Sequence, residues 1–329
     1  MNELYTQVET ILNKVDFDAI WKGFSPYDFA VFDKTSVYLK DRQIPWDERF
    51  LGSTAIEFEG SPLAIWMLPD EADIDAERIA AGIVHEMFHN FQYTQGESRG
   101  CDEFLILSYP HDLDNCRLKM AENHYLAKAF MENSHTDFSQ FIALRNTRCR
   151  IIGDIIKQEM LVETFEGMAE FAGLMALRQI NRNKFMEDIE SHLVYLRNPD
   201  NLFNVRRMAY SVGCLMCFAM KTLDIDFYHP LSDERTLFEL IPHEVNAVET
   251  SFYKQKQKLQ DEFDDFVKNH SEKVEINAKI TGFDPMNMLM LNNRFLCKRF
   301  VMLDRQYFDG PIMLEMKEDS RNEVMAYIR

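Results

Sequence analysis

AERIAAGIVHEMFHNFQYTQG, residues 76–96, is the stretch that decides how the rest of the chain is interpreted. Its apolar residues recur at helical spacing without a proline, so the sequence predicts a helix over residues 75–96. This helix carries the pattern HExxH, with His85, Glu86 and His89 at its fixed positions. Residues four apart share one helix face, so the imidazoles of His85 and His89 can reach a single metal ion. Glu86 lies about 100° farther round the helix, where it would reach a water molecule on that ion.

The helix around the two histidines is predominantly apolar, with Val84 and Phe88 among their neighbours. Two satisfied core histidines beside a surface glutamate would be the ordinary alternative. Burying three polar groups without partners is costly, however, and this favours metal binding. A catalytic zinc ion takes three protein ligands and leaves one position for water. The sequence therefore predicts a Zn²⁺ cofactor, His85 and His89 as two of its ligands, and Glu86 as the catalytic base.

The segment 159–177, EMLVETFEGMAEFAGLMAL, is the richest source of a third ligand. Four acids recur along one face of this predicted helix: Glu159, Glu163, Glu166 and Glu170. Their like charges repel one another unless a metal ion with its histidines, or arginines such as Arg145 and Arg148, neutralise them. A solvated acidic face is the alternative. The apolar neighbours and the small Gly167 favour close packing against another helix instead.

HExxH followed by a helix with EGxAE and an aromatic residue resembles the gluzincin metallopeptidases, the group that contains thermolysin and the aminopeptidase-type zinc hydrolases. The resemblance covers residues 80–93 and 140–173. By position it implies that Glu166 is the third zinc ligand and that Glu170 hydrogen-bonds one of the ligand histidines. The resemblance is specific for the metal site and weak for the substrate.

The chain between the two motifs is longer than is usual in those enzymes, so a helical segment of about 100–155 must leave the site and return. Glu122 and Glu163 therefore stay open as third ligands in place of Glu166. If Glu166 binds the metal, Glu163 is expected to lie around the site together with Glu170.

A tyrosine completes the predicted catalytic residues. In aminopeptidase-type gluzincins a tyrosine stands three residues before a glycine on a helix behind the glutamate motif, and Tyr210 and Gly213 resemble this arrangement. Tyr210 is expected to stabilise the oxyanion, with a core tyrosine as the alternative. Arg206 lies one turn earlier and would bind a substrate carbonyl or carboxylate, unless it is a surface arginine. Glu57 and Glu59, in the strand-like AIEFEG, would bind a substrate amine.

Strand-like and helical regions alternate along the chain. Residues 29–68 are rich in β-branched and aromatic residues between turn signals and predict strands. Helices are predicted over residues 115–269. The predicted fold is α+β and predominantly helical: a small N-terminal antiparallel sheet, a helical catalytic region and a β-rich tail. We expect a metallopeptidase-like domain over residues 1–273, and residues 274–329 either complete this domain or form a small module.

The chain of 329 residues carries a net charge of −18. Such an acidic chain lacks the basic surface that binds nucleic acid or anionic membranes, so neither is expected as a partner. No apolar stretch reaches the length of a transmembrane helix, and the first residues do not resemble a signal peptide. Six cysteines without a disulfide-like spacing indicate free thiols and a cytoplasmic location.

The predicted function is peptide-bond hydrolysis by a zinc metallopeptidase, with a peptide or a small amide as substrate. One alternative is a zinc hydrolase that acts on a non-peptide amide or ester. Another is a non-catalytic helical binding or scaffold protein with a vestigial metal site. Glu86 argues for catalysis, because a structural zinc site needs no base and favours four protein ligands.

Overall fold

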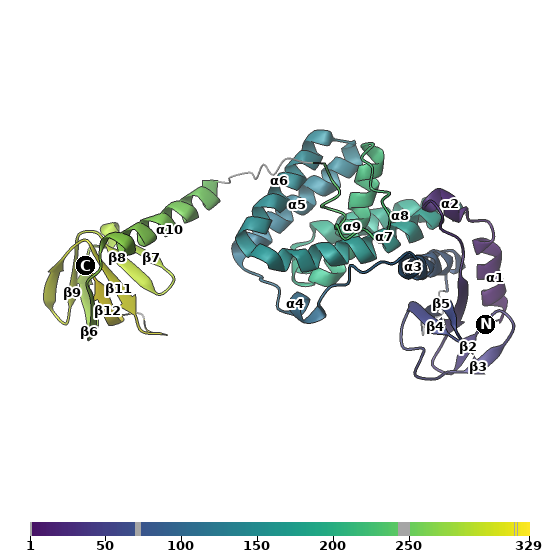
Figure 1. The fold of residues 1–329 in the computed structure, drawn as a ribbon, viewed down its shortest axis with the longest axis horizontal. Coiled ribbons are helices and arrows are strands. Elements are labelled where there is room, and N and C mark those ends of the chain that lie inside the picture. Colours follow the sequence, from purple (N-terminus) through teal and green to yellow (C-terminus); the bar gives the residue numbers. More distant parts are fainter. Residues whose placement is uncertain (1, 70–73, 243–250, 319, 321) are drawn as a thin grey trace. The chain divides into compact units, whose positions relative to one another are not determined.

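The computed structural model describes residues 2–69, 74–242, 251–318, 320 and 322–329. The chain divides into two compact units, Met1–Val248 and Glu249–Arg329. Within the described residues, the first unit holds a five-stranded sheet and helices α1 to α9, and the second holds helix α10 and a seven-stranded sheet (Figure 1). The predicted α+β, predominantly helical fold with a β-rich tail is confirmed.

The sheet of the first unit has the strand order β3-β2-β1-β5-β4. Its strands are β1 (Asp28–Phe32), β2 (Ser36–Tyr38), β3 (Gln43–Pro45), β4 (Thr54–Phe58) and β5 (Ser61–Met67). The predicted antiparallel pairing holds for β1–β2, β2–β3 and β4–β5, but β1 and β5 pair in parallel, so the sheet is mixed. Turn signals predict only pairings between consecutive strands. The pairing of β1 with β5 comes instead from the burial of both strands at the centre of the sheet.

Helix α3 (Ala76–Thr94) follows β5 and packs against the sheet and against α1 (Asn2–Leu12). Its first turn is capped by Asp75, whose carboxylate accepts hydrogen bonds from the backbone N–H groups of Glu77 and Arg78. Most of its remaining side chains are buried, including both histidines of the HExxH pattern. The predicted metal helix is therefore a rigid element of the core.

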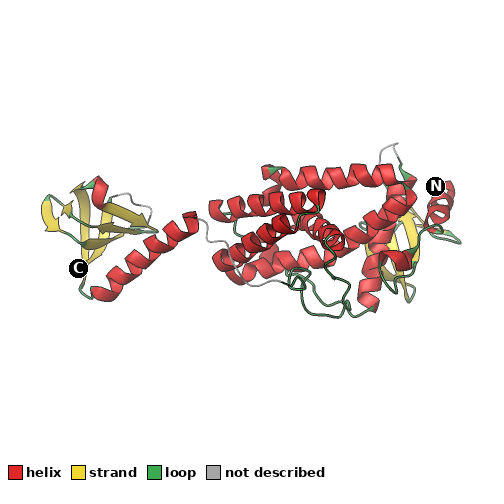
Figure 2. Ribbon diagram, turned by 90° about the horizontal axis from the view of Figure 1, so that it is seen from above, coloured by secondary structure: helices red, strands yellow, loops and turns green. Residues whose placement is uncertain are grey.

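The helical part of the first unit surrounds α7. Its elements are α2 (Phe17–Ile20), α4 (Glu103–Leu107), α5 (Leu113–Glu132), α6 (His135–Ile152), α7 (Ile156–Ile180), α8 (Arg182–Arg197) and α9 (Val205–Thr222), with short 3-10 turns at Gly153–Ile155 and Pro199–Phe203. Helix α7 packs against α3, α8 and α9, and the long helices lie side by side (Figure 2). Among the described residues, no helix combines the length and the apolar character needed to cross a membrane.

Helices α7 and α9 cross at two glycines. A Cβ atom on Gly213 would lie 2.0 Å from the carbonyl oxygen of Glu163, and one on Gly167 would lie 2.4 Å from the Cα of Gly213. Only glycine fits at this crossing, because any side chain would push the helices apart. The close approach brings the first turns of α9 beside the part of α7 that carries Glu166 and Glu170.

The C-terminal unit is built on one long strand. Its elements are α10 (Ser251–Asn269), β6 (Lys273–Phe283), the 3-10 turn Pro285–Asn287, β7 (Met288–Leu291), β8 (Arg294–Cys297), β9 (Phe300–Leu303), β10 (Gln306–Asp309), β11 (Ile312–Met316) and β12 (Glu323–Ile328). The strand order is β10-β9-β6-β12-β11-β8-β7, and β6 pairs with both β12 and β9. The tail strands thus form their own sheet rather than extend the N-terminal one.

Helix α10 belongs with these strands. Phe263 and Phe266 of this helix form a buried cluster with Leu296, Met313 and Ile328 of the sheet. The expected boundary after residue 273 assigned the helix to the preceding helical region. The compact units place it after the boundary instead, because its apolar face is covered by the C-terminal sheet.

Candidate metal centre

Three donor atoms from two helices converge at the HExxH pattern. His85 and His89 of α3 face each other with 3.1 Å between their Nε2 atoms. The Oε2 atom of Glu166, on α7, lies 3.2 Å from the Nε2 of His89 and 3.6 Å from that of His85. All three residues are buried. The structure therefore brings together the two histidines with the glutamate expected as third ligand, as a group that could hold a metal ion.

The other nitrogen of each histidine is committed to an acceptor. The Nδ1 of His85 lies 2.9 Å from Oε2 of Glu170. The Nδ1 of His89 lies 2.7 Å from Oε1 of Gln92, and the amide orientation of Gln92 is fixed because its Nε2 donates to the carbonyl oxygen of Phe165 at 3.0 Å. Since the carboxylate and the amide oxygen only accept, both Nδ1 atoms must carry the hydrogen.

This tautomer leaves the Nε2 lone pairs of His85 and His89 pointing at each other and at a carboxylate oxygen. Three electron pairs in a buried site repel unless a cation lies between them. Ligand atoms around a tetrahedral zinc ion with bonds of 2.0–2.1 Å are about 3.3 Å apart. The observed separations of 3.1, 3.2 and 3.6 Å fit such an ion.

In the absence of a metal, a proton would take the same place. Burial opposes the charged form of His85, but hydrogen bonds to Glu166 and Glu170 outweigh it and raise the pKa of His85 to about 10. The site thus favours positive charge strongly, whether that charge is a proton or a metal ion.

A chain of hydrogen bonds extends from His85 away from the donor atoms. Glu170, which accepts from His85, also lies 3.0 Å from the Nε2 of His192 on α8. The Nδ1 of His192 is 2.9 Å from the hydroxyl oxygen of Ser211 on α9. Two hydrogen-bond partners lower the pKa of Glu170 although burial alone would raise it, so this residue stays a carboxylate. The sequence predicted the position of Glu170, but it gave no spacing signal for His192.

Arg206 holds the outer oxygen of the candidate ligand. Its Nη2 donates to Oε1 of Glu166 at 2.9 Å, and its Nη1 donates to Glu103 at the start of α4. Glu166 thus directs Oε2 to the histidines and Oε1 to the guanidinium. Arg206 was predicted to bind substrate or to lie free on the surface. The structure gives it a third role, which is to orient Glu166.

The candidate base Glu86 faces a cavity of about 610 Å³. His85, His89, Glu166 and Tyr210 line the same cavity. The carboxylate of Glu86 forms no hydrogen bond or ion pair with any described residue, although the residue is only 7% exposed. Burial raises the pKa of Glu86, which increases the basicity of the carboxylate. An unpaired buried carboxylate beside the donor atoms is available to a substrate or a water molecule.

Tyr210 stands over the candidate site from α9. Its ring is stacked on that of His85, with 6.0 Å between the centroids and 11° between the planes. Burial and the nearby Glu166 carboxylate raise the pKa of Tyr210, so its hydroxyl remains protonated at neutral pH. The predicted tyrosine is thus brought to the cavity with a hydroxyl group that can donate a hydrogen bond.

Glu57 and Glu59 are not brought to the cavity. Both are exposed, and Glu59 forms an ion pair of 2.5 Å with Arg42 at the turn after β4. The residues of this region that line the cavity are Ser53 and Thr54, at the opposite end of the strand. The sequence identified the strand but not which of its ends reaches the site.

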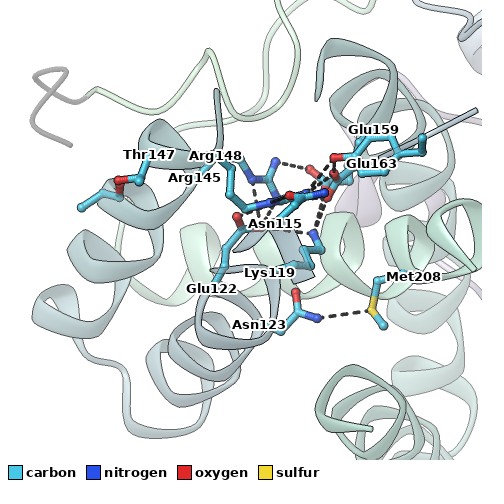
Figure 3. A network of polar contacts seen from close by, with 12 residues as sticks. Asn115, Lys119, Glu122, Asn123, Arg145, Thr147, Arg148, Glu159, Glu163 and Met208 are labelled. Carbon is cyan, nitrogen blue, oxygen red and sulfur yellow. Dashed lines mark hydrogen bonds and ion pairs between the residues drawn. The ribbon is translucent and has the colours of Figure 1, made fainter. Parts of the chain in front are cut away.

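A second acidic cluster lies apart from the histidines. Glu122 of α5 and Glu159 and Glu163 of α7 are buried with three cations, Lys119 of α5 and Arg145 and Arg148 of α6 (Figure 3). Arg145 lies 2.6 Å from both Glu122 and Glu163, and Arg148 lies 2.6 Å from Glu159. Three negative and three positive charges balance, so this cluster needs no metal ion.

The cluster accounts for the rival third ligands. Glu163 and Glu122 lie in this ion-pair network rather than at His85 and His89, where Glu166 supplies the carboxylate. Glu163 is therefore not placed around the metal site as expected. Arg145 and Arg148 were expected as one way to neutralise the acidic face of α7. They neutralise Glu159 and Glu163, whereas Glu166 and Glu170 contact the histidines.

Comparison with known proteins adds no identification: no family model, curated protein or solved structure matches the chain. Any function must therefore be argued from the site.

Proposed function

We propose that the chain is a zinc-dependent hydrolase that acts as a metallopeptidase. One observation carries this proposal: both histidine Nδ1 atoms are committed as donors, so two Nε2 lone pairs and one carboxylate oxygen converge on a single point. Two histidines and a glutamate are a ligand set of catalytic zinc sites, which leave one position open. When bound, the ion would lower the pKa of a water molecule and polarise a substrate carbonyl.

The side chains around this point have complementary roles in hydrolysis. Glu86, which has no hydrogen-bond partner among the described residues, would accept a proton from the attacking water and pass it to the leaving amine. The protonated hydroxyl of Tyr210 would donate to the oxygen that becomes negative. Arg206 would keep Glu166 aimed at the histidines by holding its second oxygen.

A peptide is the substrate that the surroundings support best. Strand β4 is at the edge of its sheet, and Ser53 and Thr54 at its start line the cavity. An extended peptide can add to such an edge through backbone hydrogen bonds. A small non-peptide amide or ester would also fit the chemistry, and a substrate panel separates the two. A scaffold role has less support, because it does not explain why Glu86 is buried without a hydrogen-bond partner among the described residues.

The proposed compartment is the cytosol. All six cysteines are free thiols, and Cys214 and Cys217 are buried in α9. Free cysteines are typical of reducing compartments, and this supports the proposal.

Metal content tests the proposal first. Purified untagged protein should contain one zinc ion per chain by mass spectrometry. Glu166→Ala should lose the metal, whereas Glu86→Gln should keep it and lose hydrolysis of a mixed peptide panel. Glu57→Ala, an exposed acid outside the cavity, is the matched control and should change neither property. A wild-type protein that takes up no zinc would overturn the proposal, as would full activity in Glu86→Gln.

A further inference from the structure

The cavity is lined by more charged side chains than the proposed hydrolysis requires. Four carboxylates line it, those of Glu86, Glu166, Glu170 and Asp188, together with three guanidiniums, those of Arg78, Arg206 and Arg207. These seven side chains sum to one negative charge. A divalent ion at the donor atoms would therefore give the cavity one excess positive charge. The loaded cavity would therefore attract an anionic group.

Two of the three guanidiniums already have carboxylate partners. Arg78 lies 3.0 Å from Asp188 and 2.6 Å from Glu187, and Arg206 lies 2.9 Å from Glu166. Arg207 forms no ion pair with any residue that the structure describes. In a chain with a net charge of −18, an unpaired arginine on the wall of a cavity stands out from its acidic surroundings.

Arg207 is held beside the candidate catalytic residues. It is exposed, and its guanidinium carbon lies 5.6 Å from the centroid of the Tyr210 ring. Its backbone N–H donates to the Oδ1 of Asn204, which fixes the turn that carries it. A carboxylate next to the reacting bond could thus reach Arg207 while the carbonyl faces Tyr210.

The place of Arg207 in its helix is unfavourable for stability. It is in the first turn of α9, where the helix dipole repels cations, and this turn contains no acid. The first turns of α3, α4, α5 and α6 each contain an acid, whereas the first turn of α8, like that of α9, contains basic residues and no acid. Arg207 therefore gains no stabilisation from the end of its helix, and an anion bound beside it would interact favourably with both the guanidinium and the helix dipole.

We propose that Arg207 forms a carboxylate-binding subsite of the cavity, and that the substrate is a peptide with a carboxylate close to the bond that is cleaved. The inference rests on the proposed hydrolase function. The carboxylate can be the free C-terminus of the peptide or an acidic side chain, and both offer the planar pair of oxygens that a guanidinium binds through two hydrogen bonds. Because Arg207 is exposed to solvent, the expected preference is about fivefold.

Binding to the zinc-loaded Glu86→Gln protein tests the subsite without turnover. Acetyl-tetraalanine would be compared with its C-terminal amide, and acetyl-Ala-Asp-Ala-Ala amide with its Asn counterpart, by titration calorimetry. The acidic member of at least one pair should bind about fivefold more tightly, and the pair that shows this identifies the source of the carboxylate. Adding Arg207→Ala should abolish the preference, and adding Arg207→Lys should retain part of it. Arg197→Ala, an exposed arginine of α8 outside the cavity, is the control and should leave the preference intact.

The outcomes separate the subsite from the reaction. No binding of any peptide, equal binding within both pairs, or a preference that survives Arg207→Ala overturns the subsite. If the preference depends on Arg207 but wild-type protein cleaves none of the four peptides or a wider panel, the subsite stands and the hydrolase proposal fails. If the wild type cleaves peptides with no dependence on Arg207, the reverse holds.

Discussion

The Nε2 atom of His192 lies 3.0 Å from Oε1 of Glu170, whose other oxygen lies 2.9 Å from the Nδ1 of His85. One carboxylate thus links a candidate ligand on α3 to a histidine on α8. Because Ser211 lies at the far nitrogen of His192, its hydroxyl can donate there while the Nε2–H of His192 donates to Glu170. The chain fixes the rotation of the His85 ring and leaves its Nε2 free to bind.

Removal of His192 should therefore weaken metal binding without removing a ligand. We expect His192→Ala to lower the zinc affinity by roughly 10- to 100-fold, the range seen for groups that orient metal-bound histidines. Competition with a chromophoric chelator measures this. His229→Ala removes a histidine outside the cavity and serves as control. An unchanged affinity in His192→Ala would show that the chain does not orient His85.

Tyr210→Phe tests the proposed oxyanion donor. The substitution keeps the ring that stacks on His85 and removes the hydroxyl. The expected result is a 10²- to 10³-fold fall in kcat with little change in KM and no loss of zinc, since the hydroxyl would act mainly in the transition state. Steady-state kinetics with a cleaved peptide, together with metal analysis, decide the point. A change confined to KM would assign Tyr210 to substrate binding.

Gly213→Ala tests the crossing of α7 and α9. The added Cβ would lie 2.0 Å from the carbonyl oxygen of Glu163, so one helix must move. We expect a loss of about 3 kcal/mol in the free energy of unfolding, at the upper end for overpacked sites. Urea unfolding followed by circular dichroism measures it. Gly100→Ala is the matched control, because a Cβ there meets no atom within 4 Å and should change stability by less than about 0.5 kcal/mol.

The buried ion-pair network should make stability depend on pH through Glu122. Burial alone would raise the pKa of this residue, but Arg145 and Arg148 outweigh it and lower the pKa from 4.5 to about 2. The carboxylate therefore stabilises the fold fully above pH 4.5, and this contribution is lost as the pH falls toward 2. Glu122→Gln should cost about 3 to 5 kcal/mol at pH 7, because it breaks a buried pair.

The gap in stability between wild type and Glu122→Gln should narrow as the pH is lowered from 5 to 3. Urea unfolding at each pH provides the measurement. Glu57→Gln, an exposed change, should show no such narrowing. A gap of constant size would mean that Glu122 keeps its ordinary pKa in the folded protein.

Metal uptake should release a proton. With the pKa of His85 raised to about 10 by its two carboxylate partners, the metal-free site holds a proton at neutral pH. Zinc must displace it, so the apparent affinity should rise about tenfold for each pH unit up to that pKa. Calorimetry in buffers of different ionisation enthalpy gives the number of protons released. Equal heats in all buffers would contradict the expectation.

The sequence predicts the parts of the site that lie within one helix. HExxH fixes the relative places of His85, Glu86 and His89, because helical geometry alone sets them. Gln92 could have been recognised in the same way, since it lies three residues after His89 and therefore on its face of the helix. Glu166 and Glu170 came from a family resemblance, and the structure brings both to the histidines.

The sequence did not predict which side chains of different helices contact one another. Glu163 and Glu166 are three residues apart and look equivalent on α7, yet one meets the arginines of α6 and the other the histidines of α3. Their partners depend on how three helices pack, which spacing along one helix does not specify. His192 was missed for the same reason, because it is linked to the site through a carboxylate on another helix.

The acidic residues of α7 fall into two pairs with different partners, and this affects how relatives of this chain should be classified. Glu159 and Glu163 serve the buried network, whereas Glu166 and Glu170 serve the histidines. The acidic stripe could therefore outlive the proposed activity, and Glu86 and Glu166 together with both histidines would be needed to distinguish an active relative from an inactive one.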